Sequence, residues 1–126
     1  MDFDANMIDI NMILGDQQIV MYLEDNSASR DLVSQLPLTV ELEDFGGGKE
    51  KIFYTPKELD LSEVRYLKMA DEGTVAIYEP WGSVCIFLNP LSRASGLVGM
   101  GHVTKEDLEI LKSTSATSVT LVDDDQ

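Results

Sequence analysis

Apolar and polar residues alternate along most of the chain, which is the pattern of half-buried β-strands. The first two alternating runs cover 8–14 and 19–23, and Gly15-Asp16 between them predicts a hairpin. Further runs with the same two-residue period lie at 38–42, 75–77, 84–88 and 119–121. We therefore expect a mainly β protein.

Two segments depart from this alternation and predict short helices. In 26–36, Asn26 is suited to cap a helix, because its side-chain oxygen accepts a hydrogen bond from the first turn. In 104–112, Thr104 followed three residues later by Asp107 resembles a capping box. Both segments space their leucines on one helical face.

The remaining stretches are connections within one domain covering 1–126. Three consecutive glycines at 46–48 predict a hairpin loop, and 55–72 predicts a long connection containing a helical turn. The acidic tail at 123–126 is expected to fray. Many short strands with two helices predict a closed β-barrel plugged at its ends by the helices.

The charge of the chain argues against several partners. Its 23 acidic residues against 9 Lys and Arg give a formal net charge of −14. Such a surface repels nucleic acids and anionic lipids and also favours solubility. The first six residues lack the features of a signal peptide, and no apolar run approaches the ~20 residues of a membrane helix. We expect a cytoplasmic protein that binds neither nucleic acid nor membrane.

Three blocks of the sequence resemble the signatures of bacterial cyclophilin-like fold proteins. They are Leu-Pro-Leu-Thr-Val-Glu-Leu-Glu-Asp-Phe at 36–45 with 50–52, Gly-Thr-Val-Ala-Ile-Tyr-Glu-Pro-Trp-Gly-Ser at 73–83 with 86–87, and Ser-Gly-Leu-Val at 95–98 with Gly101. The chain departs from the family pattern at Thr74, Ser83, Leu88 and 99–100. The resemblance implies a cyclophilin-like barrel, and a fold alone supplies no activity.

No catalytic motif, cofactor site or metal site is predicted. Prolyl isomerases of this fold carry an arginine shortly before Phe-x-x-Gln-Gly-Gly-Asp, and this chain has no such run. The glycine triplet is followed by Lys49-Glu50, where a phosphate-binding loop needs Ser or Thr after the lysine. The single cysteine, Cys85, lies in an apolar run and is expected to be a buried, unreactive thiol. The single histidine, His102, is not spaced with other residues as a zinc ligand.

Pro80-Trp81-Gly82 is the most informative point in the chain. A tryptophan in a turn between two strands either packs down over the end of the barrel, which we favour, or lines a pocket. Aromatic residues on neighbouring strands with one cation are suited to form a small apolar site. The candidate pocket residues are Phe53, Tyr78, Trp81, Phe87, Arg93 and His102.

Two hypotheses of function follow. The first is a non-catalytic binding or interaction module for an unknown small molecule or peptide, acting as a monomer or homodimer. The second, resting on the fold alone, is a diverged, weak or inactive peptidyl-prolyl cis-trans isomerase. An arginine beside an aromatic pocket would favour the isomerase. Because Arg30, Arg65 and Arg93 all lie outside the predicted core strands, we favour the binding module.

Overall fold

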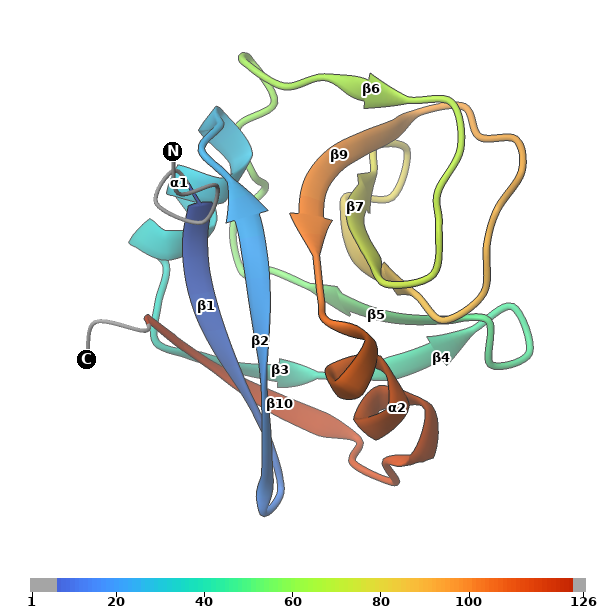
Figure 1. The fold of residues 1–126 in the computed structure, drawn as a ribbon. Coiled ribbons are helices and arrows are strands. Elements are labelled where there is room, and N and C mark those ends of the chain that lie inside the picture. Colours follow the sequence, from blue (N-terminus) through green and yellow to red (C-terminus); the bar gives the residue numbers. More distant parts are fainter. Residues whose placement is uncertain (1–6, 124–126) are drawn as a thin grey trace, which may run out of the picture.

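A computed structural model describes residues 7–123, and within that range the chain forms ten strands and two helices (Figure 1). The strands are β1 (Met7–Leu14), β2 (Gln17–Glu24), β3 (Leu38–Glu41), β4 (Glu43–Phe45), β5 (Glu50–Tyr54), β6 (Tyr66–Leu67), β7 (Thr74–Tyr78), β8 (Ser83–Phe87), β9 (Leu97–His102) and β10 (Ser118–Asp123). The helices are α1 (Ser27–Ser34) and α2 (Lys105–Ser113). The mainly β composition with two helices is confirmed. The acidic tail was predicted to fray over 123–126, but Asp123 is paired with Ile10 as the last residue of β10, and the remaining three residues lie outside the described residues.

The first predicted hairpin is present. β1 and β2 pair antiparallel over their full length, and Leu14 opposite Gln17 closes the turn. Gly15 adopts a positive φ of 64° in that turn, which a residue without Cβ adopts at little cost. The alternate apolar residues of both strands are buried, apart from the half-buried Ile8, as the two-residue period requires.

One curved sheet wraps around the interior (Figure 1). Its hydrogen-bonded order is β3-β10-β1-β2-β9-β7-β8-β5-β4, with β6 paired to β9. The two ends of this order, β3 and β4, follow one another in the chain and are separated by Leu42. Within the described residues, β3 and β4 are not paired with each other, so a closed barrel is not confirmed.

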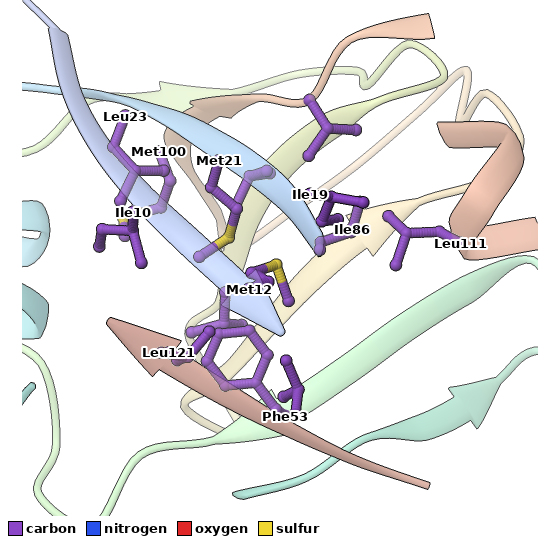
Figure 2. Packing of buried hydrophobic residues seen from close by; sticks show 14 of the residues in the cluster. Ile10, Met12, Ile19, Met21, Leu23, Phe53, Ile86, Met100, Leu111 and Leu121 are labelled. Carbon is purple, nitrogen blue, oxygen red and sulfur yellow. The ribbon is translucent and has the colours of Figure 1, made fainter. Parts of the chain in front are cut away.

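The main core fills the inside of this sheet. Figure 2 shows the Phe53 ring among core side chains from β1, β2, β8, β9, β10 and α2. α1 adds Ala28 and Leu32 to this core, and α2 adds Leu108 and Leu111. The helices therefore bury the faces that their leucine spacing predicts.

Both helices begin at the predicted caps. The Asn26 Oδ1 accepts a hydrogen bond of 2.8 Å from the Ser29 backbone N–H, and its Nδ2 donates to the Gly99 carbonyl at 3.2 Å. The Thr104 hydroxyl accepts from the Asp107 N–H at 3.1 Å. The second half of the expected capping box is absent, because the Asp107 carboxylate accepts instead from the Val20 N–H of β2 at 3.0 Å.

Two segments differ from the sequence pattern. The connection between β5 and β7 contains β6 and no helix. β9 is a strand that lacks a clear alternation of apolar and polar residues, because Gly99 and Gly101 occupy two of its positions. A Cβ added at Gly101 would lie 2.0 Å from the Tyr22 carbonyl oxygen, so glycine is needed for the close approach of β9 to β2.

A second, smaller core covers the outer face of part of the sheet. In β8, Val84 and Ile86 belong to the main core, whereas Cys85 and Phe87 belong to the outer cluster. Burial on both faces explains why β8 is apolar at nearly every position. This outer face also carries a cavity, lined by residues of these strands and of the loops beside them.

Candidate functional site

A cavity of about 390 Å³ lies on the outer face formed by β5, β7 and β8. We call it the outer-face cavity. Its lining residues are Phe45, Glu50, Ile52, Tyr78, Trp81, Ser83, Cys85, Phe87, Leu91, Arg93, Ala94, Ser95 and Leu97. Its floor is made of strand side chains, and its rim comes from the end of β4, the β7–β8 turn and the β8–β9 loop.

Trp81 stands on the rim of the cavity. Its indole ring packs edge to face against two other rings. The ring centroids of Trp81 and Phe45 are 5.1 Å apart with an interplanar angle of 87°, and those of Trp81 and Tyr78 are 5.4 Å apart with an angle of 78°. The side chain remains 51% exposed. The favoured sequence interpretation, in which Trp81 packs down over the end of the barrel, is therefore wrong. In the β7–β8 turn, the ring packs against Phe45 and Tyr78, and about half of the residue stays exposed.

Local geometry explains the position of this ring. The N–H groups of Trp81 and Gly82 both donate to the Tyr78 carbonyl, at 3.1 and 2.8 Å. Gly82 adopts a positive φ of 71°, which favours glycine. A tight, hydrogen-bonded turn of this kind holds the indole at the mouth of the cavity.

Arg93 also lines the cavity and lies in the β8–β9 loop. Ala70 and Leu91 exchange backbone hydrogen bonds of 2.9 and 2.8 Å, and the Ala94 N–H donates to the Lys68 carbonyl at 2.8 Å. These bonds fix the backbone on both sides of Arg93. Within residues 7–123 the Arg93 side chain takes part in none of the hydrogen bonds or ion pairs.

The floor holds an acid and a thiol whose pKa values are both raised. Burial raises the pKa of the Glu50 carboxyl above its ordinary value, with a smaller opposing effect of a hydrogen bond to Cys85. Burial also raises the pKa of the Cys85 thiol to about 12. The expectation that Cys85 is buried is confirmed. At neutral pH the thiol is un-ionised, which argues against a nucleophilic role.

Four of the six candidate pocket residues line the cavity: Tyr78, Trp81, Phe87 and Arg93. Phe53 does not, because it is fully buried in the main core and its neighbour Ile52 faces the cavity. His102 lies at the end of β9, where its ring stacks on Tyr22 at 5.6 Å.

Sequence reasoning missed Phe45 and Glu50. The pairing of β5 with β8 places Glu50 opposite Phe87 and Ile52 opposite Cys85, so these four side chains share one face. The alternation in β8 combined with the pairing partner would have identified Glu50. Phe45 had no comparable signal, because its position depends on the path of the glycine loop.

The described residues contain neither a metal-binding cluster nor a membrane-spanning helix. Among residues 7–123, no group of three or more His, Cys, Asp or Glu side chains is arranged to hold a metal ion. In the same part of the chain, neither helix is long and apolar enough to cross a membrane.

Comparisons with known proteins agree on the fold. No curated protein matches the chain. The solution structure of a hypothetical protein from Archaeoglobus fulgidus is similar, with a TM-score of 0.68 and 18% sequence identity, over 98% of this chain and 99% of that one. At this identity the similarity concerns the fold alone. The model of the Cyclophilin-like family matches residues 12–122. Because that match covers most of the sequence and agrees with the architecture, the chain belongs to the Cyclophilin-like family.

Proposed function

We propose that this protein is a non-catalytic binding module whose ligand, a small molecule or a short peptide segment, occupies the outer-face cavity. The observation that carries the proposal is the half-exposed Trp81 between Phe45 and Tyr78 at the mouth of a 390 Å³ hollow. Leaving a large apolar ring exposed at a concave site is unfavourable unless something covers it. The volume is within the range of small-molecule sites.

The chemistry of the lining supports binding rather than covalent catalysis. Its only thiol is un-ionised at neutral pH, because burial raises the pKa of Cys85 to about 12. The Ser83 hydroxyl lies 3.6 Å from the Cys85 Sγ, and the lining contains no histidine that would act as a base for it. Aromatic walls with few polar groups are typical of sites that bind and orient a ligand.

A ligand screen tests this proposal, with two readouts. Thermal shift detects compounds that bind the native state, because such binding raises its apparent stability. Trp81 is the only tryptophan, so its fluorescence reports directly on the cavity mouth. We expect hits to change both signals, and Phe45→Ala to weaken them by about tenfold or more.

The matched control for the screen is Tyr54→Ala. Tyr54 is also an exposed aromatic residue of β5, at 42%, but it does not line the cavity. We expect its removal to leave affinity unchanged. Hits that bind wild type, Phe45→Ala and Tyr54→Ala with equal affinity would show that the cavity is not the binding site.

One observation favours a diverged prolyl isomerase as a second candidate. Arg93 lines the same cavity as four aromatic side chains. An arginine beside an aromatic pocket is the feature that would favour the isomerase over the binding module. The binding module remains preferred, because Arg93 is an exposed loop residue and the isomerase motif is absent. In a proline-isomerisation assay we expect no acceleration over the uncatalysed rate. Acceleration that disappears in Arg93→Gln would make the isomerase the better proposal.

A further inference from the structure

Within residues 7–123, Arg93 is a cation without an ion-pair partner, although the protein is acidic. The chain has 23 acidic residues for 9 Lys and Arg, so carboxylate partners are abundant. The other two arginines use them: Arg30 pairs with Asp25 at 2.7 Å, and Arg65 forms a two-pronged pair with Glu24. Arg93 instead lines the cavity, and no ion pair of the described residues includes it.

The other charged side chain of the lining, Glu50, does not neutralise Arg93. The two residues form no ion pair, and Glu50 is half-buried on the floor strand β5. Burial raises the pKa of the Glu50 carboxyl and outweighs the lowering effect of a hydrogen bond to Cys85, and no nearby cation contributes to the shift. A guanidinium on the rim is therefore available to a group that enters from solvent.

We infer that the natural ligand is a small carboxylic acid with an aromatic or aliphatic body. The body would lie against Phe45 and Trp81, and the carboxylate would pair with Arg93. This inference rests on the proposed function, since it names the class of molecule that fills the same cavity. A guanidinium offers a planar set of donors that matches both oxygens of a carboxylate.

The net charge of −14 does not contradict an anionic ligand. At physiological ionic strength, charges more than about 8 Å away in solvent are largely screened. The unpaired guanidinium and the low-dielectric aromatic walls then determine the sign of the preferred ligand at short range. A cationic ligand would have to lie beside the unpaired Arg93, which would repel it.

The test uses matched pairs of probes that differ only in charge. Phenylacetate, 3-phenylpropanoate and 4-phenylbutanoate are compared with their primary amides by Trp81 fluorescence and thermal shift. In wild type we expect each acid to bind about tenfold more tightly than its amide. In Arg93→Gln this preference should fall to within about twofold, while the affinity for the amides stays unchanged. Arg93→Lys should retain part of the preference, since it keeps the charge and loses the planar donors.

Arg30→Gln is the matched control variant. It removes an exposed arginine on α1 that lies outside the cavity lining, so the preference for the acids should persist. If acids and amides bind wild type equally and Phe45→Ala weakens both, the carboxylate inference fails and the binding function stands. If neither set of probes binds at all, both proposals fail. Equal loss of acids and amides in Arg93→Gln would assign Arg93 a structural role and overturn the inference.

Discussion

Trp81→Ala is expected to destabilise the protein much less than Phe53→Ala, although tryptophan is the larger residue. Phe53 is fully buried among the core side chains of Figure 2, and replacing such a residue with alanine costs about 3–5 kcal/mol. Trp81 is 51% exposed, and its removal opens the site to solvent instead of leaving a closed hole.

The magnitude for Trp81 follows from its buried area. A tryptophan side chain of about 250 Å² that is half covered buries about 120 Å². At about 25 cal/mol per Å² this area is worth about 3 kcal/mol. The unfolded chain already covers part of such area, which lowers the expected loss to about 2 kcal/mol. The two variants should therefore differ by about 2 kcal/mol.

Urea denaturation followed by circular dichroism measures both losses, because Trp81→Ala removes the fluorescence signal. Tyr54→Ala serves as the control for an exposed aromatic residue and should cost less than about 1 kcal/mol. A loss for Trp81→Ala that equals or exceeds the loss for Phe53→Ala would refute this reasoning. In that case Trp81 would be a core residue, and the cavity mouth would be closed in solution.

Three further outcomes test the buried polar groups. A rise of the Cys85 pKa from 9.0 to about 12 lowers the thiolate fraction at pH 8 about a thousandfold. Disulfide reagents should therefore label Cys85 in the native protein at least a thousandfold more slowly than in the urea-unfolded protein. Comparable labelling rates would contradict the burial of Cys85. Asn26→Ala should lower the free energy of unfolding in urea by about 2 kcal/mol or more, because it removes the cap of α1 and the side-chain donor to the Gly99 carbonyl. A loss below about 0.5 kcal/mol would show that these two hydrogen bonds contribute little to stability. Burial favours the protonated form of Glu50 in the folded state, so the contribution of Glu50 to stability is complete below the unfolded pKa of 4.5 and is lost as pH rises through the folded pKa. Glu50→Gln should therefore raise the melting temperature at pH 7 and lose this advantage at about pH 4. A lower melting temperature of the variant at pH 7 would show that burying the Glu50 carboxylate carries no penalty.

Elements defined by neighbouring residues were predicted well from the sequence. The β1–β2 hairpin needs only a strict alternation and a glycine turn, and both helices need only a capping side chain and leucines on one face. These signals act over a few residues, so they do not depend on the rest of the fold. The three signature blocks predicted a cyclophilin-like fold, and the family match over residues 12–122 confirms that prediction.

The candidate site was predicted only in part, because its residues lie on a sheet that is buried on both faces. In β5, Ile52 and Phe53 are equally apolar, and the sequence does not show which of them faces the interior. The structure directs Phe53 to the main core and Ile52 to the cavity. His102 is among the predicted pocket residues, but β9 places it beside Tyr22.

The sequence by itself determined the secondary-structure class, the strand periods, the helix caps and the absence of a recognisable catalytic motif. Only the tertiary structure determined that the β8–β9 loop, tied to 68–70 by backbone hydrogen bonds, brings Arg93 to the same hollow as Phe45 and Trp81. Positions 45, 81 and 93 belong to three separate segments, namely the end of β4, the β7–β8 turn and the β8–β9 loop, and the paths of these segments depend on pairing across the sheet. Patterns of neighbouring residues carry no information about pairing between distant strands. The cavity could therefore not be predicted from them and is seen only in the tertiary structure.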